Sequence, residues 1–217
     1  MHKLAHFTSP KLSSKEAKIF RERDFIKKLN HLDQIWSCLS SRYGDTLAVK
    51  DLRGKNKEQF NFLELEQLIT KASKAFFNIG LRKGEVVTII SENSPRWLIA
   101  DQAIMRLSAI DAVRGVNSPS VELDYIIKHS KSVGLIIQDN SIWEKLKNKE
   151  ELLKDLKFII NFEDFSDKGI LSWEEFIRSG NKISSASYKA EVDKCAINDV
   201  ATILYTSGTT GKPKGVP

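Results

Sequence analysis

The chain has 217 residues, of which 41 % are hydrophobic and 29 % charged, with 34 Lys and Arg against 28 Asp and Glu. This balance is typical of a globular protein and excludes disorder along the whole chain. No apolar run approaches the roughly 20 residues that a membrane-spanning helix needs. The length suggests one domain, or one domain and part of another.

The net charge of +6 is concentrated in an N-terminal arm. Residues 1–30 hold eight Lys or Arg and three Asp or Glu, whereas the remaining 187 residues hold 26 and 25. The sequence has neither zinc-finger spacing nor an RNA-binding aromatic motif, so we expect no nucleic-acid partner. We interpret the arm as a frayed, solvated helix. Peripheral membrane contact is the alternative, because Ile19, Ile26 and Leu29 could share one helical face among the bases.

The cysteines and histidines bear on compartment and metal binding. Cys38 and Cys195 are far apart and form no disulfide framework, which fits a reducing compartment. We therefore predict a cytoplasmic location. His2 and His6 are four residues apart, but no Cys or carboxylate partner lies nearby, so we expect no metal site there.

In chain order, the first strong pattern is a run of apolar residues at helical spacing, which predicts a helix over about 62–79. Asn61 followed by Glu64 resembles a capping box at its start. Gly80 is the expected end, because glycine adopts a left-handed conformation without strain. Residues 85–90 form a β-branched run without alternation, which suits a strand buried on both faces.

The same alternation continues along the chain. Pro95 can open a helix to about Ser108 that is apolar almost all round and hence buried. Further strands are predicted at 111–114, 133–137, 158–160 and 200–205, and further helices from Pro119 (with Leu123, Ile126 and Ile127 inside), at 141–154 (exposed and Lys-rich), and after Ser172, which Glu175 helps to cap.

Buried strands that alternate with helices predict an α/β fold, in which helices cover a parallel-rich sheet. We expect four segments. They are a basic N-terminal arm (1–30), an N-terminal α/β subdomain (31–180), a polar connector (181–199), and a strand with a phosphate loop (200–217).

The chemistry of the sequence is concentrated in residues 206–216, after the last predicted strand. Three glycines there allow tight turns and inward-pointing N–H groups, and four hydroxyls and two lysines add donors and charge. Such a loop can form a nest for phosphate groups at the end of a buried strand, where α/β sheets bind ligands. It is not a Walker A loop, because Thr206 occupies the first glycine position and Pro213 follows Lys212.

Residues 205–215, which read YTSGTTGKPKG, resemble the AMP-binding signature of the adenylate-forming enzymes. This family includes acyl-CoA synthetases, luciferase-like enzymes and peptide-synthetase adenylation domains. The match spans the whole signature, and residues 80–87 add a weaker one.

Two further stretches favour one branch of the family. Residues 91–101, and 111–115 followed by 121–130, are most similar to long-chain acyl-CoA synthetases, and above all to cyanobacterial and plastid acyl–acyl-carrier-protein synthetases. They argue against a peptide-synthetase domain. Taken alone, Arg96, Trp97 and Arg114 would more often be structural residues than site residues.

The resemblance implies a ligase that joins a fatty acid to AMP, using ATP and Mg²⁺ and releasing pyrophosphate. The acyl group then passes to the thiol of CoA or of acyl-carrier-protein phosphopantetheine. Thr206 is the expected Mg²⁺ ligand, and Lys212 sits at a variable position. The resemblance places the cradle for the β- and γ-phosphates on Thr206, Ser207, Gly208, Thr209, Thr210, Gly211 and Lys214.

The family's adenine pocket, magnesium-binding glutamate and catalytic lysine come later in the chain than its signature. We therefore expect no catalytic residue in these 217 residues, and no adenylation by them alone. We expect the natural protein to be longer. The favoured interpretation is the N-terminal part of a long-chain fatty-acid ligase, and the alternative is a non-catalytic truncated module that binds nucleotide or a partner.

Overall fold

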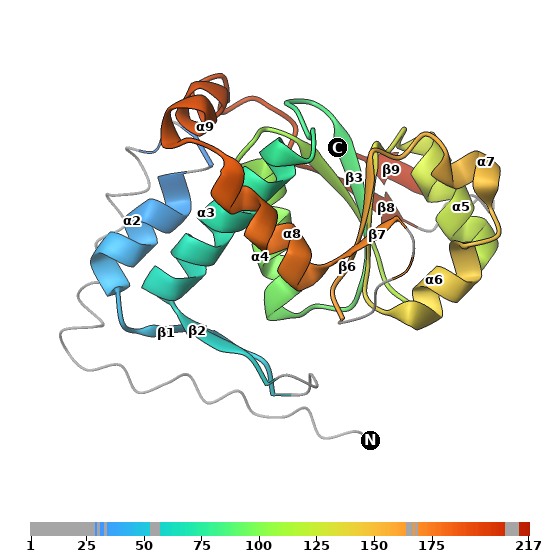
Figure 1. Ribbon diagram of the computed structural model, residues 1–217, viewed down its shortest axis with the longest axis horizontal. Coiled ribbons are helices and arrows are strands. Elements are labelled where there is room, and N and C mark those ends of the chain that lie inside the picture. Colours follow the sequence, from blue (N-terminus) through green and yellow to red (C-terminus); the bar gives the residue numbers. More distant parts are fainter. Residues whose placement is uncertain are drawn as a thin grey trace.

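The computed structural model describes residues 29, 31–32, 34–52, 57–163, 167, 169–206 and 213–217. Within them, seven strands form the main sheet (Figure 1): β3 (Val86–Ile90), β4 (Ile110–Arg114), β5 (Gly134–Ile137), β6 (Phe158–Asn161), β7 (Ile170–Ser172), β8 (Thr202–Thr206) and β9 (Lys214–Val216). Their order is β7-β6-β5-β3-β4-β8-β9. All neighbours are parallel except β8 and β9, which are antiparallel. The predicted parallel-rich α/β fold is confirmed.

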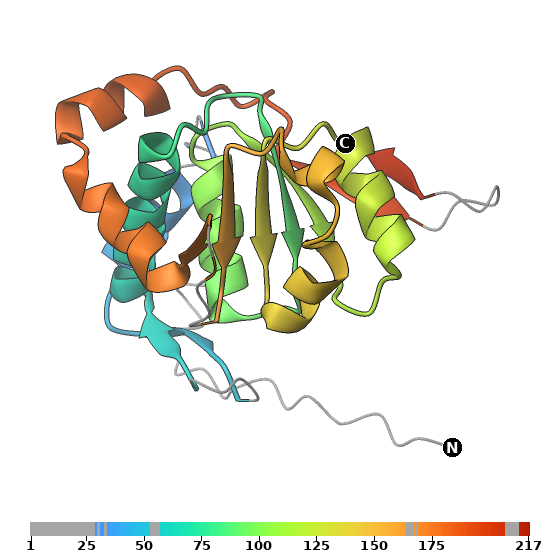
Figure 2. The same cartoon turned by 45° about the vertical axis from the view of Figure 1, so that its right-hand side comes forward.

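Helices cover both faces of this sheet (Figure 2). One face carries α3 (Phe62–Asn78), α4 (Pro95–Met105) and α8 (Trp173–Ser179). The other carries α5 (Ser120–His129), α6 (Asn140–Leu146) and α7 (Glu150–Leu153). Because both faces are covered, the strands need no polar alternation, and all five residues of the central strand β3 are buried.

Several predicted helix ends are confirmed by their hydrogen bonds. The Asn61 side chain accepts from the N–H of Glu64, and the Glu64 carboxylate accepts from the N–H of Asn61, which completes the capping box of α3. Ser172 and Glu175 form the same reciprocal pair at α8. Gly80 follows α3 with φ of 97°, in the left-handed region that favours glycine.

Two predicted helices differ in the structure. The helix from Pro95 ends at Met105 rather than near Ser108, because Ser108 adopts φ of 48° as the chain turns towards β4. The predicted helix at 141–154 is two helices, α6 and α7. The break between them contains Asn148, and asparagine is unfavourable in helix interiors. It is also not wholly exposed, since Ile142, Trp143, Leu146 and Leu152 are buried.

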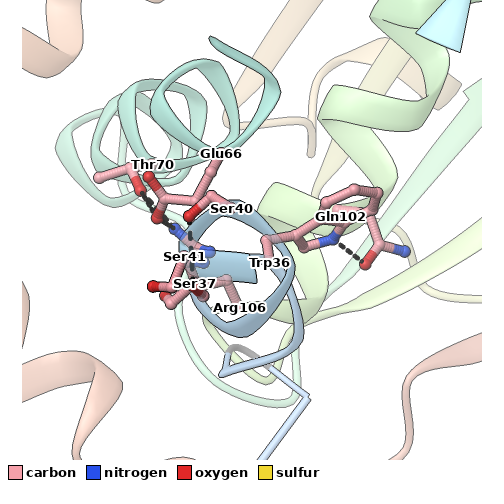
Figure 3. A network of polar contacts seen from close by, with 8 residues as sticks. All are labelled: Trp36, Ser37, Ser40, Ser41, Glu66, Thr70, Gln102 and Arg106. Atoms are coloured by element: carbon pink, nitrogen blue, oxygen red, sulfur yellow. Dashed lines mark hydrogen bonds and ion pairs between the residues drawn. The ribbon is translucent and has the colours of Figure 1, made fainter. Parts of the chain in front are cut away.

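A small second layer lies on the outer side of α3. It holds α2 (Gln34–Tyr43) and an antiparallel pair of strands, β1 (Leu47–Lys50) and β2 (Gln59–Asn61). Figure 3 shows its polar contacts: the Trp36 indole N–H donates to the Gln102 side chain at 2.7 Å, and Arg106 binds both Glu66 and Thr70 of α3. The first contact joins α2 to α4, and the second joins Arg106, at the end of α4, to α3.

The stretch expected to be a connector contains a 3-10 turn (Gly180–Lys182) and α9 (Ser185–Val192). The basic arm lies outside the described residues, apart from residue 29. Among the residues that are described, no helix is long and apolar enough to cross a membrane.

Candidate functional site

The signature begins in β8 and ends in β9, the last two strands at one border of the main sheet (Figure 1). β8 lies between β4 and β9. Of the expected phosphate cradle, Thr206 ends β8 and Lys214 begins β9. The other five members lie outside the described residues: Ser207, Gly208, Thr209, Thr210 and Gly211.

The register of the hairpin brings Thr206 and Lys214 together. They are directly paired across β8 and β9, as are Leu204 and Val216 two residues away. Paired residues point to the same face of a sheet, so the hydroxyl and the ammonium stand on one face, and both residues are exposed. The two ends of the signature therefore present a hydroxyl and a positive charge side by side at the mouth of the loop.

Gly215 allows side chains to pack closely on the opposite face of this hairpin. A Cβ at Gly215 would lie 3.0 Å from the Ile203 side chain and 3.2 Å from the Tyr205 ring. The ring of Tyr205 thus packs over the backbone of β9, and β9 can lie flat against β8. This is a packing reason for glycine at this point of the signature.

Tyr205 anchors the end of β8 to α5. Its side chain is 6 % exposed and its hydroxyl lies 2.9 Å from Nδ1 of His129, whose ring stacks on Tyr125. Burial raises the pKa of the Tyr205 phenol, and the neighbouring Tyr125 adds to this shift, so the hydroxyl stays protonated at neutral pH. The anchoring role of His129 was not predicted, although Tyr125 and His129 at i and i+4 must share one face of a helix.

Arg96 and Trp97 belong to the stretch that resembles the long-chain branch, and both contact other elements of the fold. Arg96 binds Glu58 at 2.8 Å and lies 3.7 Å from Glu174, and it also donates to the carbonyl of Phe162. Trp97 is partly buried and packs against the hydrophobic core between the sheet and helices α3, α4 and α8. Arg96 therefore joins α4 to the β1–β2 pair and to α8.

Asp111 is a buried acid that no motif in the sequence marks. It is 1 % exposed on β4 and pairs in register with Thr202 of β8. Burial, and after it the neighbouring Asp101 carboxyl group, raise its pKa to about 8. Asp111 lies near the amino end of β4, whereas the signature loop leaves the carboxyl end of β8, so it does not belong to the loop site.

The part of the chain that the structure describes holds no second candidate site. A small pocket lined in part by Met105, Ser108, Cys195 and Ala201 lies at the amino ends of β4 and β8, away from the carboxyl end of β8. No group of three or more His, Cys, Asp or Glu side chains in the described part of the chain could hold a metal ion.

Known proteins resemble this chain in both sequence and structure. It is 33 % identical over 198 residues to the probable acyl-activating enzyme 16 (chloroplastic) of Arabidopsis thaliana, and 31 % identical over 199 residues to the long-chain-fatty-acid–[acyl-carrier-protein] ligase AEE15 (chloroplastic) of the same plant. Human long-chain-fatty-acid–CoA ligase ACSBG2 is 31 % identical over 180 residues. These alignments cover 81–84 % of this chain and 27 % of each relative, so the chain spans about a quarter of their length.

Solved structures share the fold. The anthranilate CoA ligase AuaEII, in complex with anthranoyl-AMP, matches with a TM-score of 0.73 and 22 % identity over 87 % of this chain and 34 % of its own. A long-chain-fatty-acid-CoA ligase from Archaeoglobus fulgidus matches with a TM-score of 0.67 and 24 % identity, over 86 % of this chain and 36 % of its own. The family described as "AMP-binding enzyme" matches residues 39–217. With the complete signature at its β8–β9 hairpin, the chain belongs to the AMP-binding enzyme family.

Proposed function

We propose that this chain is the N-terminal part of an ATP-dependent long-chain fatty-acid ligase. The observation that carries the proposal is the hairpin that places Thr206 and Lys214 on one exposed face, at the two ends of an AMP-binding signature. The names of the relatives supply the substrate class, since they are long-chain-fatty-acid ligases for CoA or for acyl carrier protein.

The proposed reaction brings negative charges together, and the composition of this loop can lower the cost of doing so. A fatty-acid carboxylate attacks the α-phosphate of ATP, giving acyl-AMP and pyrophosphate, so an anion must approach a polyanion and the leaving group gains charge. Preorganised N–H groups, hydroxyls and cations lower the cost of such charge. The loop residues and Lys214 would hold the β- and γ-phosphates, with Lys214 as the charged member.

The residues present fit a Mg²⁺ site only in part. The exposed Thr206 hydroxyl can supply one oxygen ligand to a cation that phosphate oxygens already hold. Mg²⁺ prefers oxygen ligands and, when bound, neutralises charge on the phosphates. Thr206 would supply one ligand, and the resemblance implies a glutamate later in the chain as another.

The thiol that receives the acyl group is either CoA or acyl-carrier-protein phosphopantetheine. One relative is named for the carrier protein and another for CoA, with the same identity of 31 %. Both acceptors are therefore carried forward, and the assay must supply each separately. The cytoplasmic location and the membrane contact of the basic arm stay predictions.

The test uses the natural protein that contains these residues, at its full length. We expect it to exchange labelled pyrophosphate into ATP only when palmitate or oleate is present, and to form a thioester with CoA or with the carrier protein. Residues 1–217 alone should show no exchange. Failure of the full-length protein with every fatty acid offered would contradict the proposal and support the non-catalytic module, which the names of the relatives do not favour.

A further inference from the structure

The parallel ladder between β4 and β8 ends before the signature loop begins. Its register starts at Asp111 with Thr202 and ends at Val113 with Leu204. On its other side β4 continues one residue further, to Arg114 opposite Ile90 of β3. The end of β8 thus passes the last backbone pairing with β4, and contacts of another kind must hold it to the centre of the sheet.

The side chain of Arg114 supplies such a contact. Its Nη1 donates to the carbonyl oxygen of Tyr205 at 3.2 Å, across 91 residues of sequence. Its Nε donates to the hydroxyl of Ser118 at 3.0 Å, in the turn that leads to α5. Its Nη2 forms an ion pair with Glu122 in the first turn of α5. One guanidinium therefore joins β4, α5 and the residue before Thr206.

The charge of Arg114 is balanced where it lies. Nε and Nη1 each have a hydrogen-bond acceptor, and Nη2 is paired with the carboxylate of Glu122. A planar guanidinium suits this task, because its donors are fixed in a fork, whereas a lysine is a point charge. These contacts assign Arg114 to holding the strand and not to neutralising a phosphate.

We propose that Arg114 is a positioning residue for the phosphate loop. By binding the carbonyl of Tyr205 it fixes the point at which Thr206 leaves the sheet, while His129 holds the Tyr205 hydroxyl from the α5 side. The proposal rests on the proposed function, since it needs the loop to bind ATP. A displacement of about 1 Å in a binding group can cost about 100-fold in rate, so a clamp at the start of the loop has a measurable effect.

The kinetic test uses the full-length natural protein and two variants of the clamp. Arg114→Lys keeps the charge and loses the fork, so we expect kcat/KM for ATP to fall about 10- to 100-fold, with KM for the fatty acid unchanged. Glu122→Gln should lower kcat/KM for ATP in the same direction and by less. If Arg114 were instead a phosphate ligand, Arg114→Lys would be tolerated and Glu122→Gln would tighten ATP binding. Either result would overturn the proposal.

Arg82 offers a matched control. It also donates to backbone carbonyls, those of Phe77 and Leu81, and packs over the Phe77 ring, but it precedes the amino end of β3. Arg82→Lys should therefore leave kcat/KM for ATP unchanged. An equal loss in Arg82→Lys and Arg114→Lys would mean that the loss reports general destabilisation, and would overturn the positioning role.

Hydrogen exchange on the full-length natural protein, without nucleotide, separates this proposal from the proposed function, because it needs no ATP. Arg114→Lys should speed exchange of the amides of Tyr205, Thr206 and β9 about tenfold, and Arg82→Lys should not. Glu122→Gln serves as the second variant if Arg114→Lys fails to fold. Faster exchange in a protein that does not use ATP would support the clamp and refute only the proposed function. Unchanged exchange would refute the clamp, even in an active ligase.

Discussion

Replacing Asp111 by Asn should make the protein more stable at alkaline pH. Asp111 is 1 % exposed and lies beside Asp101 of α4 and Thr202 of β8. Burial chiefly, and Asp101 next, raise its pKa from 3.8 to about 8. The protonated acid carries no charge in this buried site beside Asp101, and an asparagine of the same shape stays neutral at every pH.

The size of the effect follows from the shift in pKa. Each pKa unit is worth about 1.4 kcal/mol, so a shift of about four units corresponds to about 5 kcal/mol. Because the folded pKa lies above the unfolded one, the stabilisation is complete below pH 4 and is lost as the pH rises to about 8. Asp111→Asn removes this loss, so the variant should gain on the wild type by several kcal/mol between pH 5 and pH 9.

Urea unfolding of residues 1–217 at pH 5, 7 and 9, followed by tryptophan fluorescence, measures this gain. Asp193→Asn is a matched control, because Asp193 is exposed and paired only with Lys189 among the contacts described for it, and the change should stay within about 0.5 kcal/mol. An Asp111→Asn variant whose free energy of unfolding has the same pH dependence as the wild type would refute the reasoning.

Two further predictions concern packing and charge. Gly180→Ala would place a Cβ 2.5 Å from the carbonyl oxygen of Lys71 and 3.0 Å from the amide nitrogen of Ala75, which are backbone atoms of α3 that cannot move aside. We expect the free energy of unfolding, measured in urea, to fall by about 1–3 kcal/mol. An unchanged midpoint would contradict this. Hydrogen bonds from Lys83 and Ser108 lower the pKa of Asp199 to about 2. An NMR titration should therefore find this carboxylate still charged at pH 3, and should find a higher pKa for it in Lys83→Ala. A pKa near 4 in the wild type would refute the pairing.

The sequence predicted those elements whose own residues determine them. The capping box at Asn61, the glycine after α3 and the β-branched run of β3 are local features, and all three are confirmed. Helix α2 has no fully buried residue, so its pattern is weak, and it depends on contacts such as that of Trp36 with Gln102. Strand β9 has three residues and exists because β8 is there to pair with it.

The candidate site shows the same division. The composition of residues 205–215 predicts a phosphate loop, and the match to the AMP-binding enzyme family over residues 39–217 confirms the family. The pairing of Thr206 with Lys214 follows from the register of the closed hairpin, which no residue in the loop specifies by itself. The contact of Arg114 with Tyr205 spans 91 residues, and only the packing of β4 beside β8 brings it about.

The most direct test compares two lysines of the signature in the full-length protein. Lys214 stands on the exposed face beside Thr206, whereas Lys212 was not assigned to the phosphate cradle. Lys214→Ala should lower kcat/KM for ATP about 100-fold in fatty-acid-dependent pyrophosphate exchange, and Lys212→Ala should change it less than about threefold. Equal effects of the two substitutions, or no effect of Lys214→Ala, would contradict the assignment of this hairpin as the ATP phosphate site.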